Sequence, residues 1–444
     1  MPCCKKPILH VDLETYSSVD LAACGVYKYA ESLDFKILLF GYAWGNDPVE
    51  VLNLMEEDLP FSLVSALANE NITKVAHNAN FERVCLTRYV KDYAKRYILG
   101  ESVKKKLTED EFLPPEQWQD TMILAAENGY PASLGQLGPA LGIAEDKVKL
   151  ATGKRLLQYF CRPCKPTKAN GGRWRNLPEH DPEKWNLFIE YNRRDVESAR
   201  AIYNKLNSLI PVSDQEWENW SRDQRINDRG IHVDTQIIKN VQSYTIEHGM
   251  ELMKEARYIT GLENPQSVAQ LKKWILNQEG HDVESLNKDA VKELLKGTLR
   301  PETRRALEIR QELGKTSVKK YDAFQRACGE DDRIRGTFQF FGGRTGRWAG
   351  RLIQPQNFPR PSFDEVDEPR TLVKDGDFEL LELIYPSMND VFATILRTVI
   401  TPPEGKSFVV ADYSAIEARV IAWLTRTTWR ASIQERRRHL LCIS

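Results

Sequence analysis

The alternation of apolar and polar residues predicts strands in the first part of the chain. Residues 8–15 alternate with a period of two, and 36–44 form a longer apolar run. A Gly-Asn-Asp-Pro turn signal then precedes a further apolar stretch at 49–54. We interpret 8–52 as a strand meander, followed by a strand at 74–77 that leads into a helix.

Helical spacing dominates the remainder. Leu187, Tyr191, Ala199 and Tyr203 recur every four residues, which predicts a long helix over 182–209 with these residues on its buried stripe. Charged helical patterns fill 214–330, beyond a boundary that Pro211 marks. A short strand is expected at 337–341, a buried strand at 407–411 and a helix over 415–424. Strands followed by mixed elements indicate an α/β first domain.

Composition narrows the class of protein. The 444 residues include 62 basic and 63 acidic side chains, are 41 % hydrophobic and 28 % charged, and allow two to four domains. No global polycation exists, so a nucleic-acid surface must come from local clusters. The first apolar run is too short and too soon interrupted for a signal peptide or a membrane span. We therefore expect a cytoplasmic protein that does not associate with membranes.

Two cysteines have the spacing of half a zinc site. Cys161 and Cys164 form a CxxC pair, but no second Cys or His pair accompanies them. Ordinary reduced cysteines are the favoured interpretation.

Acidic residues on the first strand suggest a metal site. Asp12 and Glu14 share one face of the strand, where two carboxylates repel each other unless a cation intervenes. Mg²⁺ prefers such oxygen ligands. The alternative is a solvated strand face.

Two further acidic residues stand at informative places. Asp195 lies in the buried stripe one turn after Tyr191, where a bare carboxylate is costly unless it is paired or metal-bound. A structural ion pair with Arg193 or Arg194 is the alternative. Glu82 falls in the first turn of the predicted helix after 74–77, a place that the helix dipole favours for any acid.

In order, these segments resemble the three motifs of the DnaQ-like (DEDD) 3′–5′ exonucleases. Asp-Leu-Glu at 12–14 matches the first motif, Asn-Ala-Asn-Phe-Glu at 78–82 resembles the second, and Tyr191 with Asp195 matches the Tyr-x-x-x-Asp third. The family has Asp where this chain has Glu82. The resemblance implies an RNase H-like exonuclease domain over 1–210.

The resemblance also implies a two-metal site that uses Mg²⁺ or Mn²⁺. One ion would lie between Asp12, Glu14 and Asp195, and the second would be held by Asp12 and, through waters, by Glu82. Tyr191 would orient the attacking water.

Basic residues gather in the last quarter of the chain. Between Gly342 and Pro361 there are four arginines and no acid, which suits contact with a phosphate backbone, although a solvated basic loop remains the alternative. The order Thr-Gly-Arg, then Gln-Asn-x-Pro, resembles the primer–template segment of family A DNA polymerases, most closely of phage or prophage enzymes. The candidate DNA-binding residues are Arg344, Thr345, Arg347, Arg351, Gln356 and Asn357.

A second family A motif follows. Residues 412–419, Asp-Tyr-Ser-Ala-Ile-Glu-Ala-Arg, resemble the first palm motif of that family. The resemblance implies that Asp412 ligates both polymerase metals and that Glu417 rejects ribonucleotides at the sugar. It also implies a helical thumb over 211–335 and the start of an α+β palm over 336–424, in an enzyme of DNA replication that binds primer–template DNA.

Residues 425–444 depart from the family pattern. The Arg-rich tail replaces the fingers and the second catalytic carboxylate, so we interpret it as an atypical, frameshifted or arbitrary end. We expect no polymerase activity from this chain alone, and a separate polypeptide with the missing fingers and palm is a candidate partner. A stand-alone exonuclease and an inactive DNA-binding remnant are the alternative functions.

One more basic segment is notable. Residues 162–178 contain five cations and no acid, which suggests a contact to single-stranded DNA or else a solvated loop.

Overall fold

A computed structural model describes residues 6–108, 111–143, 153–314 and 316–425. The chain divides into two compact units, residues 1–401 and 402–444. Of the tail predicted as atypical, residues 426–444 lie outside the described residues.

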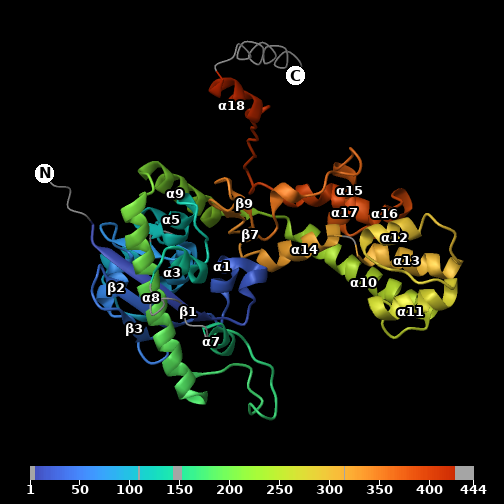
Figure 1. Ribbon diagram of the computed structural model, residues 1–444. Coiled ribbons are helices and arrows are strands. Elements are labelled where there is room, and N and C mark those ends of the chain that lie inside the picture. The colour runs from blue at the N-terminus through green and yellow to red at the C-terminus, as the bar shows by residue number, and fades with distance from the viewer. Residues whose placement is uncertain (1–5, 109–110, 144–152, 315, 426–444) are drawn as a thin grey trace. The chain divides into compact units, whose positions relative to one another are not determined.

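A five-stranded mixed sheet organises the beginning of the first unit (Figure 1). Its strands are β1 (Ile8–Tyr16), β2 (Lys36–Trp44), β3 (Glu50–Asn53), β4 (Thr73–Ala76) and β5 (Trp118–Asp120). They lie in the order β3-β2-β1-β4-β5. Strand β1 pairs antiparallel with β2 and parallel with β4, so it is a central strand with partners on both sides. The α/β character predicted from the sequence is confirmed.

The predicted strand meander over 8–52 is wrong at one point. Helix α1 (Leu21–Glu31) separates β1 from β2. It begins because the Asp20 carboxylate accepts a hydrogen bond of 2.8 Å from the backbone N–H of Ala22, which satisfies a donor that the first helical turn leaves open. The left-handed backbone of Gly25, with φ of 79°, then kinks the helix.

The two faces of β1 pack against different helices. Leu9, Val11 and Leu13 join a core with residues of α2 (Phe61–Leu67) and α3 (Ala79–Arg96). Tyr16 joins a second core with residues of α7 (Gly153–Phe160) and α8 (Pro182–Leu209). Side chains alternate along a strand, so Asp12 and Glu14 share the face of Tyr16, toward α8.

Helix α8 has the predicted bounds, and three of the predicted stripe residues, Tyr191, Asp195 and Ala199, are buried. The prediction for Leu187 is wrong, because its side chain is 51 % exposed and Phe188 fills the core instead. A four-residue step turns an α-helix by about 40° more than a full turn, so a strict four-residue stripe drifts away from the buried face within two steps.

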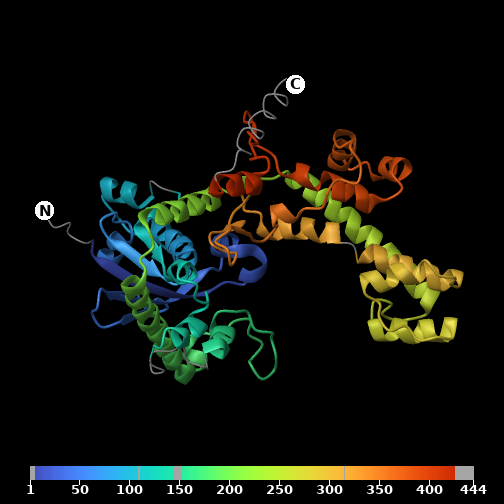
Figure 2. The ribbon, with the colours of Figure 1, turned by 45° about the horizontal axis from the view of Figure 1, so that its top comes forward.

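The remaining helices of the unit cover the sheet or form the region after residue 210. Near the sheet these are α4 (Glu101–Thr108), α5 (Thr121–Glu127) and α6 (Leu134–Ala140). After it come α9 (Asp214–Arg229), α10 (Thr235–Thr260), α11 (Val268–Glu279), α12 (Lys288–Leu294), α13 (Pro301–Leu313), α14 (Thr316–Ala327), α15 (Asp367–Asp375), α16 (Phe378–Ile384) and α17 (Met388–Ile395). Helices α10, α14 and α17 share one core, and α11–α13, yellow in Figure 2, enclose another. None of the helices in the described ranges is both long and apolar enough to cross a bilayer.

A largely buried ion pair joins helix α9 to helix α3. Arg83 is fully buried and donates from both terminal nitrogens to Asp228, at 2.9 and 2.6 Å. Trp220, also on α9, belongs to the core beneath β1. Breaking such a buried pair leaves an uncompensated charge, so the pair fixes α9 against α3.

In the second unit, the buried strand predicted at 407–411 is absent, which is a correction. Val409 and Val410 are 94 % and 89 % exposed. A strand becomes a buried sheet element only through hydrogen bonds to neighbours, and no strand among the described residues pairs with this segment. Helix α18 (Ile416–Leu424) forms as predicted.

Candidate metal-dependent nuclease site

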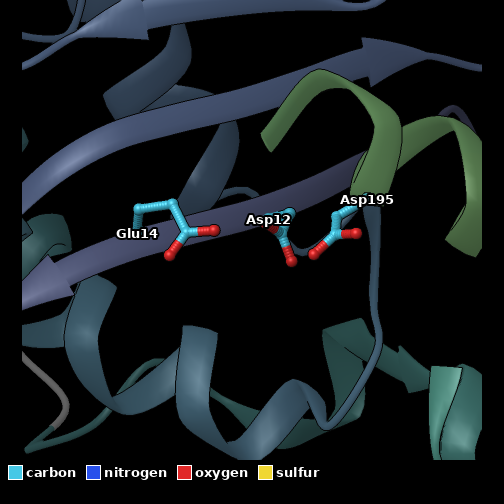
Figure 3. A group of neighbouring side chains, drawn as sticks. All are labelled: Asp12, Glu14 and Asp195. Atoms are coloured by element: carbon cyan, nitrogen blue, oxygen red, sulfur yellow. The ribbon is translucent and has the colours of Figure 1, made fainter. Parts of the chain in front are cut away.

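Three carboxylates from two distant segments meet beside the sheet. Asp12 and Glu14 project from β1 and Asp195 from α8, and one oxygen of each lies within 4.8 Å of the others (Figure 3). Glu14 and Asp195 are buried, at 5 % and 4 % exposure. The residues that the sequence singled out separately are therefore brought together.

A glycine on the neighbouring strand lets α8 approach. Gly41 of β2 lies opposite Asp12 in the ladder. A Cβ there would be 2.4 Å from Asn192 Oδ1 and 2.8 Å from Val196 Cγ2, so no larger residue fits without moving α8. The sequence analysis missed this contact, and it missed Asn192, whose Nδ2 donates to Asp12 Oδ2 at 2.6 Å. The sequence did offer a signal for Asn192, namely a polar residue next to Tyr191 on the buried side of the predicted helix.

Tyr191 stands one turn before Asp195 at the same site. Its ring fits because Gly153 has no side chain, since a Cβ there would be 2.0 Å from the ring. Burial raises the pKa of the Tyr191 hydroxyl, and the negative charge of Asp195 raises it further. The raised pKa favours the neutral hydroxyl, which suits it to orient a water rather than to act as a base.

The segment that carries Glu82 is held by a carboxylate on the adjacent strand. Strand β4 ends at Ala76, and Asn78 then adopts a left-handed backbone with φ of 69°. Asp120, at the end of β5, accepts from the backbone N–H groups of Asn78 (2.9 Å) and Ala79 (3.0 Å). Asp120 thus fixes the turn that begins α3. Sequence reasoning missed it, although an acid directly after a buried strand was visible.

Glu82 is buried, at 3 % exposure, in the first turn of α3. Burial raises its pKa well above the usual range, and the charge of Asp12 raises it further. Its Oε2 has no hydrogen-bond partner in the described part of the chain. An acid that merely caps a helix stays hydrated, so this burial favours a ligand role over the simple dipole explanation.

The donor set fits divalent metal ions with oxygen ligands. Several carboxylates at this spacing repel each other, and a buried carboxylate oxygen without a donor is costly. A bound Mg²⁺ or Mn²⁺ removes both penalties. Asp12, Glu14 and Asp195 could hold one ion, and Asp12 with Glu82 a second.

The CxxC pair does not form a cysteine-rich metal group within the described ranges. Cys161 Sγ donates to Glu14 Oε2 at 3.9 Å, and Cys164 Sγ to the carbonyl of Arg173 at 3.3 Å. Cys161 thus borders the acidic site.

The predicted DNA-binding segment forms an exposed turn. Two short strands, β8 (Phe338–Gln339) and β9 (Ala349–Gly350), pair across it. The candidate residues are exposed, namely Arg344, Thr345, Arg347, Arg351, Gln356 and Asn357. Trp348 Nε1 donates to Asp223 Oδ1 at 2.8 Å, which ties the turn to α9. Burial raises the pKa of Asp223 to about 6. Base-edge contacts through Gln356 and Asn357 stay a prediction.

Asp412 and Glu417 lie in the second unit. Both are exposed, and Glu417 stands in the first turn of α18. Their roles in a polymerase site stay predictions.

Comparisons with known proteins identify the relatives. No family model matches the chain. It is 45 % identical over 427 residues to a curated DNA polymerase of Bacillus phage SP02, an alignment that covers 96 % of this chain and 62 % of that polymerase. The chain is thus a relative of a phage DNA polymerase, as the motifs predicted, and it spans less than two thirds of that relative's length.

Two solved structures are distantly similar. One is the POL domain of Pol1 from M. smegmatis in complex with DNA primer-template and dNTP, with 15 % identity, 95 % of this chain and 60 % of that chain covered, and a TM-score of 0.49. The other is the apo form of a nuclease, with 14 % identity, 50 % and 81 % coverage, and a TM-score of 0.29. The separate polypeptide partner stays a prediction.

Proposed function

We propose that the chain carries the 3′–5′ exonuclease, and the start of the polymerase domain, of a family A DNA polymerase. The observation that supports this most directly is the meeting of Asp12, Glu14 and Asp195 within 4.8 Å. The strand order and the mixed pairing of the sheet are consistent with an RNase H-like domain over 1–210. The helices after 210 would be the thumb, and 336–424 the start of the palm.

The proposed reaction is hydrolysis of the terminal phosphodiester bond of a DNA strand. A water oxygen attacks phosphorus and loses a proton, while the bond to the 3′ oxygen of the penultimate nucleotide breaks. That oxygen gains a proton, and a nucleoside 5′-monophosphate leaves. Divalent ions, when bound, would activate the water and neutralise charge on the phosphate.

The chain's own residues would position these reactants. Asn192 holds one oxygen of Asp12, so the Asp12 carboxylate keeps its orientation. The neutral Tyr191 hydroxyl would orient the attacking water. Glu82, with its raised pKa, must lose a proton before it can bind a cation, so metal binding and hydrolysis should strengthen with pH.

The test is degradation of single-stranded DNA in Mg²⁺ or Mn²⁺. A 3′-labelled oligonucleotide should lose its label as a mononucleotide, and a 5′-labelled one should give a ladder of shorter products. Asp12→Ala should lower the rate by about 10³-fold or more, because it removes the carboxylate shared by both proposed ions. Asp47→Ala, at an exposed turn of the same domain, is the matched control. Absence of degradation by folded wild-type protein would leave the chain a DNA-binding remnant.

The curated relative is a DNA polymerase, and this chain covers 62 % of its length. Our prediction is that this chain by itself does not extend a primer, because the sequence supplies one palm carboxylate, Asp412, where two-metal transfer needs carboxylates on both sides of the metal pair. Primer extension with dNTPs measures this. Template-directed incorporation that Asp412→Ala abolishes would contradict the prediction.

A further inference from the structure

A basic loop between α7 and α8 is not used by the proposed site. Residues 162–176 contain five cations and no acid, and the cations are Arg162, Lys165, Lys168, Arg173 and Arg175. The Arg173 guanidinium donates to the neutral Asn176 Oδ1 at 2.8 Å. A loop with five positive charges and no acid of its own favours an anionic partner.

The loop has a defined shape. Asn170 Nδ2 donates to the carbonyl of Lys165 at 2.8 Å, and the N–H of Gly172 to the carbonyl of Thr167 at 2.9 Å. Across its base, the N–H of Cys164 donates to the carbonyl of Trp174 at 2.8 Å. These bonds hold the loop as a hairpin-like turn, so its cations are presented from a fixed frame, and Lys165 and Lys168 are exposed at its tip.

The base of the loop adjoins the acidic site. Cys161 Sγ, at its first end, lies 3.9 Å from Glu14 Oε2. At its other end the Arg175 guanidinium stacks 3.8 Å from the centroid of the Tyr16 ring, and Tyr16 follows Glu14 on the same face of β1. The loop therefore begins and ends beside the Glu14 end of the carboxylate row.

One aromatic side chain of the loop is open to a ligand. The indole of Trp174 is 70 % exposed, while the guanidinium of its neighbour Arg175 stacks on the ring of Tyr16. A flat exposed aromatic ring flanked by cations is the combination that binds single-stranded nucleic acid, because bases stack on the ring while the cations contact phosphates.

The acidic site creates a need for such a surface. Glu14, Asp12 and Asp195 repel the phosphates of a strand whose end must approach them. Cations at one end of the carboxylate row offset that repulsion and supply most of the sequence-independent affinity.

We propose that the loop 162–176 is a binding surface for single-stranded DNA, in which Lys165 and Lys168 contact phosphates and Trp174 stacks on a base. The loop would hold the strand just behind its 3′ end, and these residues position the substrate without touching the scissile bond. The inference rests on the proposed exonuclease function for its purpose, but DNA binding by the loop is measurable without hydrolysis.

The decisive experiment compares two double variants of the full chain with equal charge change. Lys165→Gln with Lys168→Gln alters the loop, and Lys104→Gln with Lys105→Gln removes two exposed cations of α4. Affinity for a 12-nucleotide single-stranded DNA is measured in EDTA over a range of salt concentrations. Loss of two phosphate contacts should reduce the slope of log affinity against log salt by about 1.4, and lower affinity at low salt by about tenfold. The α4 variant should match wild type.

Trp174 provides an independent readout. Trp174→Ala should weaken binding by about tenfold with an unchanged salt slope, and Trp174→Phe should restore most of the affinity. If both loop variants bind like wild type, the proposal is overturned. An equal loss in the α4 variant would also overturn it, since the effect would then be one of general charge.

Hydrolysis separates this proposal from the proposed function. In an active enzyme, the loop variants should raise KM for single-stranded DNA and leave kcat unchanged. Wild-type protein that binds through the loop but never hydrolyses DNA would refute the exonuclease and leave the loop surface standing. Equal loss of affinity for an RNA strand of the same length would extend the partner to single-stranded nucleic acid in general.

Discussion

Two apolar runs of the sequence, one containing Asp12 and the other followed by Asp412, have different structures. Strand β1 (Ile8–Tyr16) carries Asp12 and pairs with β2 on one side and β4 on the other. Residues 407–411, just before Asp412, form no strand, and Val409 is 94 % exposed. The two patterns predicted the same element. The difference shows that an apolar run specifies a strand only where the rest of the chain supplies partners for its backbone.

The difference extends to the carboxylates. Glu14 and Asp195 are buried and lie near Asp12, so the three carboxylates repel one another where a cation would offset the repulsion. Asp412 is exposed, and water solvates its charge. The buried acidic cluster is therefore a candidate cation site, while the isolated exposed acid has no such need for a cation.

The largest expected effect comes from removing one acid in each region. Asp195→Ala should lower the nuclease rate by about 10³-fold or more, because the proposed metal then loses a ligand from α8. Asp412→Ala should leave the rate within about twofold of wild type. The measurement is release of 3′ label from single-stranded DNA in Mn²⁺.

Thermal unfolding without metal provides a second test of the variants Asp195→Ala and Asp412→Ala. Asp195→Ala should raise the Tm, since it removes repulsion among buried carboxylates, and should abolish most of the rise in Tm that Mn²⁺ gives wild-type protein. Asp412→Ala should change neither quantity. A nuclease that tolerates Asp195→Ala would break the comparison, because the buried cluster would then be merely structural.

A smaller effect concerns pH and the buried acid at the end of β5. Burial raises the pKa of Asp120 from 3.8 to about 6, against the opposing effect of the backbone N–H groups that it accepts from. A carboxyl with a raised folded-state pKa contributes stability below its unfolded pKa, and this contribution is lost as pH rises to about 6. The shift corresponds to about 3 kcal/mol.

The expected outcome is a pH-dependent difference between wild type and Asp120→Asn. Relative to the variant, wild-type protein should lose about 3 kcal/mol of unfolding free energy between pH 4 and pH 7, followed by urea denaturation. Ile123→Val, a neighbouring buried change without a titratable group, should differ from wild type by the same amount at each pH. A flat difference for Asp120→Asn would show that this acid is solvated like those at the surface.

Much of the fold near the site could be predicted from the sequence. The bounds of α8 and the strands β1 and β2 followed from periodicity, because each buries one face or both against a large core. Asp12, Glu14, Tyr191 and Asp195 were identified because a motif fixes their spacing along the chain. These are local properties, which a linear pattern records.

The missed features depend on contacts between distant segments. Asn192 matters because it meets Asp12, and Gly41 because α8 crosses β2 at that residue. Asp120 holds Asn78 from a strand more than forty positions away. The kinked helix α1 was missed because the apolar alternation on both sides of it masked the capping signal at Asp20. The strand predicted at 407–411 is absent for a related reason. Whether a strand has pairing partners depends on distant segments, which a linear pattern does not record.

The smallest expected difference between the two regions comes from removing a tyrosine hydroxyl next to Asp195 or next to Asp412. Tyr191→Phe should lower kcat for hydrolysis by about tenfold, because the attacking water loses a group that orients it, with KM and the pH profile unchanged. The pH profile should stay the same because burial and the charge of Asp195 both raise the pKa of the hydroxyl. Two control variants should retain full rate. Tyr203→Phe, also on α8, loses a hydrogen bond to Gln119 of β5, and Tyr413→Phe lies beside Asp412 and is 72 % exposed. An unchanged kcat in Tyr191→Phe would mean that the carboxylates alone position the water, and that the tyrosine serves only to pack α8 against α7.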